Sequence, residues 1–321
     1  MKYYSTNKQA PLASLEEAVV KGLAGDKGLY MPEHIRPLDK DTISGLKNKS
    51  FHEIACTAAQ AFFGEDIEPE TLDAIVRDTL SFETPVVPVR DNIYSLELFH
   101  GPTLAFKDVG GRFMARLLGY FIKKEGLKQV NVLVATSGDT GKAAMAGFAD
   151  VPGTRIIVFY PKDGVSPVQE KQMVTQKGEN TFVVGIEGNF YDAQTGVKKM
   201  FNDQKLAEEL AASGFQFSSA NSINIGRLVP QIVYYVYAYA TLVKNEQIKN
   251  GELINITVPT GNFGNILAAY YAKLIGLPVD KLICASNTNK VLFDFFTTGT
   301  YDKKREFTVT SSPSMDILIS S

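Results

Sequence analysis

Hydrophobic positions along the chain fall into short continuous runs that alternate with longer stretches of helical periodicity. From residue 86 onward, apolar and β-branched runs of four to eight residues are each followed by a segment whose apolar positions recur every three or four residues. Such runs are typical of parallel strands covered by helices on both faces. The pattern predicts an α/β fold with mainly parallel sheets. The predicted strands span residues 130–135, 155–160, 180–186, 215–220, 253–258 and 281–286.

The first 85 residues show a different pattern, which predicts helices. Ser14 precedes Glu17 by three positions, and Ser50 precedes Glu53 in the same way. This S-x-x-E spacing is typical of helix starts, because the two side chains satisfy backbone N–H groups that lack helical partners. Two prolines in TPVVP, residues 84–88, then interrupt the pattern. We therefore expect a helical N-terminal region and two α/β domains, at residues 1–85, 86–225 and 226–321.

The loops that follow the predicted strands are rich in Gly, Ser, Thr, Asn and Asp. Ligands of open parallel sheets bind outside the carboxyl ends of the strands, where such loops lead into helices. Turns and helix caps favour the same residues, so one such loop alone is weak evidence for a site. Several of them on one edge favour a binding site. They are ATSGDTGKA (135–143), YPKDG (160–164), GIEGNF (185–190), SSANSINIGR (218–227), PTGNFGN (259–265) and ASNTN (285–289).

Composition and charge exclude several classes of protein. Hydrophobic residues make up 45% and charged residues 21% of the chain, as in ordinary globular proteins. The 33 Lys and Arg residues against 35 Asp and Glu residues leave no global positive charge to bind nucleic acid or an anionic membrane. The apolar stretch 229–243 contains Pro230 and is shorter than the roughly 20 residues that span a bilayer. With two cysteines and no apolar N-terminal signal, the sequence predicts a cytoplasmic protein without disulfides.

Several common site motifs fail when their positions are counted. SGDTGK resembles a phosphate-binding P-loop, but that motif requires Gly where the chain has Thr136 and Ser or Thr where it has Ala143. A nucleophile elbow around Ser137 would require Gly in place of Ala135 and Asp139. No G-x-G-x-x-G follows a predicted strand, and the three histidines are too far apart for a local metal motif. We expect no catalytic metal.

One lysine has the surroundings of a carbonyl-reactive amine. Lys107 follows Phe106 at a predicted helix start, in the segment FHGPTLAFKDVGGRF. A lysine that loses contact with solvent loses part of its proton affinity, and the neutral amine can form a Schiff base with a carbonyl group. By itself this segment fits a surface lysine better.

The glycine-rich segment VPTGNFGN, residues 258–265, changes that interpretation. Gly261 and Gly264 permit positive φ angles and a close approach to the main chain. Backbone N–H groups at a helix start bind anions, and residues 259–265 include no Lys or Arg. A carbonyl-reactive lysine together with a backbone phosphate site is what pyridoxal phosphate requires. We expect its aldehyde at Lys107, its phosphate on this segment and its ring hydroxyl beside the SGDTG loop.

Six dispersed parts of the chain, taken in order, carry a family resemblance. They are YYSTNKQAP with GLYMPE, FHGPTLAFKD, TSGDTGKAA, EGNFYDAQ, NSINIGR and VPTGNFGN. Together they resemble threonine synthases of the bacterial and fungal type, over essentially the whole chain. The resemblance implies fold type II of the pyridoxal-phosphate enzymes, which is similar to the β subunit of tryptophan synthase.

The resemblance also implies roles for individual residues. Lys107 would form the Schiff base with pyridoxal 5'-phosphate and shuttle protons once substrate has released it. The residues implied to bind the cofactor phosphate are Gly261, Asn262, Phe263, Gly264 and Asn265. The loop implied to face the ring hydroxyl, at Asp139, and the substrate carboxylate consists of Ser137, Gly138, Asp139 and Thr140. The residues implied to bind the substrate phosphate are Asn221, Ser222 and Arg227. Related enzymes often carry Asn in place of Asp139.

The implied reaction converts O-phospho-L-homoserine and water to L-threonine and phosphate by γ-elimination and β-hydration, the last step of threonine biosynthesis. This chemistry makes the protein a carbon–oxygen lyase, and we expect a monomer or a homodimer. One alternative is another lyase of the same fold, such as a serine or threonine dehydratase, whose substrate carries no phosphate. The other is a chain that binds the cofactor without turnover. It arises because family members usually continue beyond SSPSMDILISS with a segment that contacts the pyridine nitrogen.

Overall fold

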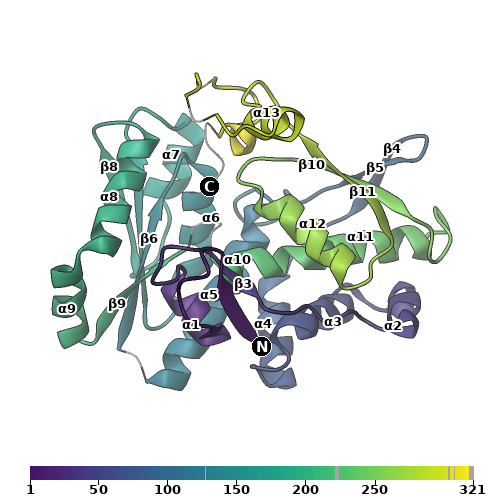
Figure 1. Ribbon diagram of the computed structural model, residues 1–321, viewed down its shortest axis with the longest axis horizontal. Coiled ribbons are helices and arrows are strands. Elements are labelled where there is room, and N and C mark those ends of the chain that lie inside the picture. Colours follow the sequence, from purple (N-terminus) through teal and green to yellow (C-terminus); the bar gives the residue numbers. More distant parts are fainter. Residues whose placement is uncertain (127, 221–223, 303, 307, 318–321) are drawn as a thin grey trace. The chain divides into compact units, whose positions relative to one another are not determined.

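The computed structural model describes residues 1–126, 128–220, 224–302, 304–306 and 308–317 (Figure 1). The chain forms two compact units, each built from segments that are distant in sequence. Unit 1 comprises Met1–His34, Phe63–Pro85 and Leu96–Pro230. Unit 2 comprises Ile35–Phe62, Val86–Ser95 and Gln231–Ser321. The division into 1–85, 86–225 and 226–321 stays a prediction, and each unit draws on more than one of these ranges.

Unit 1 contains a four-stranded sheet in which all neighbouring strands are parallel. The strands lie in the order β8-β7-β6-β9. Val132 of the inner strand β6 lies opposite Ile156 of β7 and Ser218 of β9. The strand bounds are β6 Gln129–Ala135, β7 Thr154–Pro161, β8 Thr181–Ile186 and β9 Phe215–Ser219. The carboxyl end of β6 is therefore flanked by strands on both sides.

Helices cover both faces of this sheet (Figure 1). Helix α8 (Phe190–Asn202) packs in one apolar cluster with Leu133 of β6. Helix α6 (Asp139–Phe148) lies on the opposite face, where a Cβ atom added to Gly141 would come within 2.8 Å of the Val158 side chain. Leu133 of β6 pairs with Ile157 of β7, and Val158 is the next residue of β7. Because successive strand residues point to opposite faces, Leu133 and Val158 lie on opposite faces of the sheet. The other helices of unit 1 include α1 Leu15–Lys21, α4 Pro69–Thr79, α7 Pro167–Val174, α9 Gln204–Ala212 and α10 Ile225–Leu228.

The long helix α5 (Lys107–Glu125) packs against α6 with main chain touching main chain. A Cβ atom at Gly111 would lie 3.0 Å from the carbonyl oxygen of Ala143, and one at Gly147 would lie 2.8 Å from the backbone of Gly111. Further along, Arg116 donates a hydrogen bond to the carbonyl of Gly147 at 2.7 Å. Because these contacts advance together along both helices, α5 and α6 begin at the same end, next to the carboxyl end of β6.

The N-terminal part contains the predicted helices and, in addition, a small antiparallel sheet that the sequence pattern did not indicate. Strand β1 pairs with both β2 and β3, at β1 Lys2–Ser5, β2 Ala13–Ser14 and β3 Tyr30–Pro32. Strands of two to four residues are too short to show an alternating pattern. The expected helix starts are confirmed, because the Ser14 hydroxyl accepts a hydrogen bond from the Glu17 N–H at 3.1 Å and Ser50 accepts one from Glu53 at 3.3 Å.

Unit 2 is built around two parallel strands, β10 and β11, with Ile256 opposite Leu282. With these strands, all six predicted strands and the parallel α/β class are confirmed. The elements that lie wholly or partly in this unit are α2 Lys40–Gly45, η1 Leu46–Asn48, α3 Phe51–Phe63, β4 Val86–Arg90, β5 Ile93–Leu96, η2 Val229–Gln231, α11 Ile232–Lys244, β10 Ile254–Pro259, α12 Gly264–Leu274, β11 Val279–Ala285, α13 Val291–Thr298 and η3 Pro313–Met315. Within the described part of the chain, we find no helix that is both long and apolar enough to cross a bilayer.

Candidate active site

Lys107 is the first residue of α5, and the loop before it is folded back onto the helix start. The carboxylate of Asp108 accepts hydrogen bonds from the backbone N–H of Thr103, at 2.9 Å, and from its hydroxyl, at 2.6 Å. Burial raises the pKa of Asp108, although these hydrogen bonds favour its charged form. Leu104 takes a φ of 57°, and a Cβ atom at Gly101 would lie 2.5 Å from the Asp108 carboxylate. The start of the helix, and with it Lys107, is thereby fixed.

The amine of Lys107 loses its proton far more easily than that of an exposed lysine. Burial lowers its pKa from the ordinary value of 10.5 to about 8. The negative charge of Asp139 opposes this effect, whereas the positive charges of Arg227 and Lys142 reinforce it. The Nζ atom lies 5.5 Å from the ring centroid of Phe106. Near pH 8 both protonation states are populated, so Lys107 can act as a nucleophile towards a carbonyl carbon and as a proton acceptor.

The loop between β6 and α6 is arranged by Thr136. Its buried hydroxyl accepts hydrogen bonds from two backbone N–H groups of the following turn, among them that of Gly138, both at 2.9 Å. Gly138 takes a φ of 131°, and a Cβ atom there would lie 2.4 Å from the side-chain amide of Gln169. Only glycine fits this position, because any side chain would be strained and would collide. The predicted residues Ser137 and Thr140, both half-buried, flank this turn.

Asp139 begins α6 and belongs to a buried polar cluster. Its Oδ1 atom accepts a hydrogen bond from the side-chain amide of Gln169 at 2.8 Å and lies 3.2 Å from Nζ of Lys142. Neither of these partners is among the residues predicted from the sequence. Lys142 could have been found from its spacing of three residues on one helix. Ser166 and Gln169 have the spacing of a capping box, but that spacing does not reveal that Gln169 contacts Asp139.

Arg227 lies in the short helix α10 and is buried, with 3% of its surface exposed. Its Nη1 atom donates a hydrogen bond to the carbonyl of Ala220 at 2.6 Å. The backbone of Arg227 also touches α5, since a Cβ atom at Gly110 would lie 2.8 Å from the Arg227 carbonyl oxygen. The structure thus brings the predicted residues Lys107, Asp139 and Arg227 into one electrostatic neighbourhood. The predicted substrate residues Asn221 and Ser222 lie outside the described residues.

The predicted phosphate segment joins β10 to α12 in unit 2, and all five of its residues are half-buried. The residue with a positive φ is Phe263, at 67°, and neither Gly261 nor Gly264 is left-handed. Neither glycine therefore adopts the positive φ angle that it permits. A Cβ atom at Gly261 would lie 2.3 Å from the carbonyl oxygen of Ser314, so glycine is required there by a close main-chain approach. The segment still presents the first backbone N–H groups of an eleven-residue helix, which is an anion-binding arrangement.

Asn265 is held in place by Tyr235. The Tyr235 hydroxyl donates hydrogen bonds to the side-chain oxygen of Asn265 and, at 3.3 Å, to its backbone carbonyl. Burial raises the pKa of Tyr235, so the hydroxyl stays protonated and remains a donor. This tyrosine is not among the residues predicted from the sequence. No local pattern could reveal it, because 30 positions separate the two residues.

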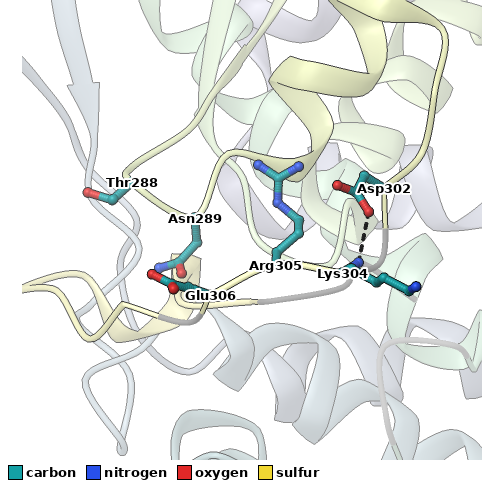
Figure 2. A pocket seen from close by; sticks show the side chains of 6 residues that line it. All are labelled: Thr288, Asn289, Asp302, Lys304, Arg305 and Glu306. Atoms are coloured by element: carbon teal, nitrogen blue, oxygen red, sulfur yellow. Dashed lines mark hydrogen bonds between the residues drawn. The ribbon is translucent and has the colours of Figure 1, made fainter.

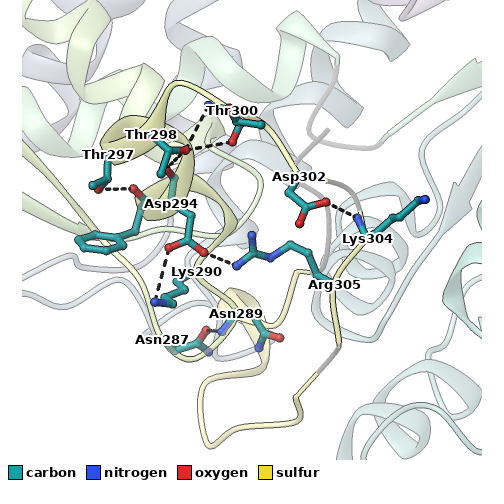
Figure 3. Close-up of polar contacts among 11 residues, drawn as sticks. Asn287, Asn289, Lys290, Asp294, Thr297, Thr298, Thr300, Asp302, Lys304 and Arg305 are labelled. Atoms are coloured by element: carbon teal, nitrogen blue, oxygen red, sulfur yellow. Dashed lines mark hydrogen bonds and ion pairs between the residues drawn. The ribbon is translucent and has the colours of Figure 1, made fainter.

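A surface cavity of about 370 Å³ lies elsewhere in unit 2 (Figure 2). It is lined by Thr288, Asn289, Asp302, Lys304, Arg305 and Glu306. Arg305 forms an ion pair with Asp294, which also lies 3.5 Å from Nζ of Lys290 (Figure 3). The hydrogen bond from Arg305 lowers the pKa of Asp294. None of the predicted site residues lines this cavity, and its arginine, Arg305, is paired with Asp294.

Comparison with known proteins gives consistent matches over the whole chain. Residues 2–80 match the family "Threonine synthase N terminus", and residues 80–318 match "Pyridoxal-phosphate dependent enzyme". The threonine synthase of Pseudomonas aeruginosa is 39% identical over 100% of this chain and 67% of its own length. The mouse protein "Threonine synthase-like 1" is 41% identical over 98% of this chain, but the chain spans only 44% of that relative.

Among solved structures, the pyridoxal-phosphate-bound threonine synthase of Brucella melitensis superimposes with a TM-score of 0.90 at 40% identity. It covers 100% of this chain, which corresponds to 68% of the Brucella chain. The two family matches together account for residues 2–318 in the order expected for these enzymes. The chain therefore belongs to the threonine synthase family of pyridoxal-phosphate-dependent enzymes of fold type II.

Proposed function

We propose that this protein is a threonine synthase, which converts O-phospho-L-homoserine and water to L-threonine and phosphate in the cytoplasm. Family membership supports the cofactor class, and the site geometry supports the residue roles. The observation that carries the proposal is Lys107, an amine whose pKa of about 8 lets it react with a carbonyl group near neutral pH. When bound, pyridoxal phosphate supplies the electron sink that stabilises negative charge at the substrate α-carbon.

The residues present fit this cofactor. Lys107 offers the amine that the cofactor aldehyde requires. The first turn of α12, residues 261–265, offers backbone N–H groups for the phosphate, without a basic side chain in the segment. Asp139 is the proposed partner of the ring hydroxyl, and its fixed carboxylate is an acceptor for that O–H group.

The substrate carries two anionic groups, and the chain offers a candidate for each. The residues proposed for the α-carboxylate are Ser137, Gly138 and Thr140 at the start of α6, where the hydroxyls of Ser137 and Thr140 can donate hydrogen bonds. Arg227 is the proposed partner of the substrate phosphate, together with Asn221 and Ser222, because a guanidinium binds phosphate oxygens through paired hydrogen bonds. Lys107, once free, accepts and returns the protons that move at the α- and β-carbons.

A second candidate is a cofactor-binding protein of the same family with another reaction or none. The observation that favours it is the similarity to "Threonine synthase-like 1", which at 41% identity matches as well as the threonine synthases do. A dehydratase acting on serine or threonine would need Lys107 and the α12 segment but no phosphate-binding arginine. Oligomeric state, monomer or homodimer, stays a prediction.

The decisive experiment supplies O-phospho-L-homoserine and measures free phosphate and L-threonine together. Equal amounts of both products support threonine synthase activity, and neither forms with Lys107→Ala. Ammonia released from threonine, without phosphate chemistry, would instead identify a dehydratase. A cofactor absorbance band that is lost on borohydride reduction, with no product from any of these substrates, would support binding without turnover.

A further inference from the structure

A buried ion pair stands one helical turn into α6. The Lys142 ammonium lies 3.2 Å from Oδ1 of Asp139, and the two side chains retain only 10% and 11% of their exposed surface. A charge that is taken out of water is costly unless a partner of opposite sign faces it. Among the ion pairs of the described residues, such as the exposed pair Lys162 and Glu187, burial of both partners to this degree stands out. An ion pair this deeply buried is expected to affect the charge of the groups around it.

The carboxylate of Asp139 is oriented from a second direction by a neutral group. The Gln169 amide donates to the same Oδ1 atom at 2.8 Å, while its own carbonyl oxygen accepts the Ser166 N–H at 3.1 Å. Both ends of the Gln169 amide are therefore engaged, and the amide cannot flip without losing a bond. Lys142 is thus the positive group that balances Asp139 within this cluster, and Gln169 fixes the orientation of the carboxylate without adding charge.

The helices α5 and α6 begin side by side, and both charges of the ion pair act on Lys107. The charges that act on Lys107 are those of Asp139 and Lys142 on α6 and of Arg227 on α10. Asp108, the neighbour of Lys107, is held by Thr103. The charged groups from the other elements packed on α5 lie further along the helix. Asp78 of α4 binds Arg116, and Glu16 of α1 faces Glu125.

We propose that Lys142 is a positioning residue of the Lys107 site, whose ammonium offsets the charge of Asp139 and so prevents that carboxylate from holding a proton on Lys107. Without Lys142, Asp139 would act on Lys107 as an uncompensated negative charge and favour the unreactive ammonium form. The ion pair therefore lets the Asp139 carboxylate, a hydrogen-bond acceptor, lie near Lys107 without suppressing the nucleophilicity of the Lys107 amine. This inference rests on the proposed role of Lys107, but its test does not depend on turnover.

The test measures the titration of Lys107 directly in the full chain from which cofactor has been removed. Trace acetic anhydride acetylates neutral amines, and mass spectrometry of the peptide that contains Lys107 reports the labelled fraction between pH 6 and 11. We expect a midpoint near 8 for the unaltered protein. Lys142→Met should raise that midpoint by about one to two pH units, the range typical of an unbalanced charge nearby. Lys142→Arg, which keeps the charge, should restore most of the original value.

Two further variants separate this role from a structural one. Lys162→Met, which breaks the exposed ion pair with Glu187, should leave the Lys107 midpoint unchanged. Asp139→Asn should move the midpoint down, opposite to Lys142→Met, because the Lys142 charge is then uncompensated. Opposite shifts cannot come from general loosening of the fold. A midpoint within about 0.3 pH units of the original in Lys142→Met overturns the proposal, since a nearby charge shifts a pKa by more than this. Should that variant not fold, an unmoved midpoint in Asp139→Asn overturns it equally.

Phosphate release from O-phospho-L-homoserine is assayed in parallel on the unaltered protein. If that activity is absent while the midpoints shift as expected, the proposed reaction fails and the role of Lys142 stands. If the activity is present and the midpoints do not move, the role of Lys142 fails alone.

Discussion

Replacing Lys107 with Met should stabilise the cofactor-free protein at neutral pH, although it removes the residue proposed to hold the cofactor. The pKa of Lys107 is about 8 in the folded protein and near 10.5 when the chain is unfolded. Between these values the unfolded state binds one more proton than the folded state, so stability rises with pH through this window. Below pH 8 the full cost of the buried ammonium is present.

The size of this cost follows from the two pKa values. They differ by about 2.5, and each pKa unit corresponds to about 1.4 kcal/mol, so the cost is about 3 kcal/mol at neutral pH. Methionine has a similar length and no charge, so it should relieve most of this cost. We expect Lys107→Met to raise the free energy of unfolding by about 2–3 kcal/mol at pH 7, and the gain to fade towards pH 10.5.

Urea unfolding followed by circular dichroism at pH 7, 8.5 and 10 measures the difference between Lys107→Met and the unaltered protein. Contributions from every other titrating group cancel in this difference as long as they are the same in both proteins. Lys171→Met, at an exposed position of α7, serves as the control and should show no pH-dependent difference. The reasoning is refuted if Lys107→Met is less stable at pH 7, or if the difference between the two proteins stays constant up to pH 10.

Three further changes test other parts of the structure. Gly261→Ala places a Cβ atom 2.3 Å from the Ser314 carbonyl and should lower the free energy of unfolding by about 1–3 kcal/mol in a urea titration. Gly45→Ala, which meets no atom within 4 Å, is its control, and equal effects of the two would contradict the steric argument. Ser166→Ala removes the cap of α7 and should cost about 1 kcal/mol in the same measurement, with no loss at all counting against the observed capping box. Arg227→Lys should raise KM for O-phospho-L-homoserine about tenfold or more with a smaller change in kcat, and an unchanged KM in steady-state kinetics would remove Arg227 from the phosphate site.

The six strands could be predicted because each is a short run rich in apolar residues that alternates with helical segments, and residue 135 at the end of β6 marks where a predicted site loop begins. Sheet β2-β1-β3 could not be predicted, since its strands are short and their pairing joins distant residues. The glycine-rich segment lies between a strand and a helix as predicted, but its left-handed residue is Phe263 and not a glycine. Which residue takes an unusual backbone angle is decided by packing from elsewhere in the chain, which composition does not record.

The partners of Asp139 show the same limit. Lys142 lies three residues after Asp139 on the same helix, a spacing at which side chains meet. Gln169 lies thirty residues after Asp139, on α7, and reaches it only because strand β7 returns the chain to this edge of the sheet. The sequence could therefore indicate that a carboxylate stands at the helix start. It could not indicate that the Gln169 amide also holds that carboxylate, or that the whole cluster is buried.

The glycine contact between α5 and α6 has an entropic consequence for the chemistry at their common end. Side chains that meet across a helix interface can exchange rotamers, and each exchange shifts the helices slightly. At Gly111 and Gly147 the surfaces that meet are main chain, which has no rotamers to exchange. The distance between the starts of α5 and α6, which carry Lys107 and Asp139, is then set by main-chain contact and does not vary with side-chain rotamers at these positions. Functional groups held on these two helix starts are ordered before substrate binds, so little conformational entropy is lost on binding.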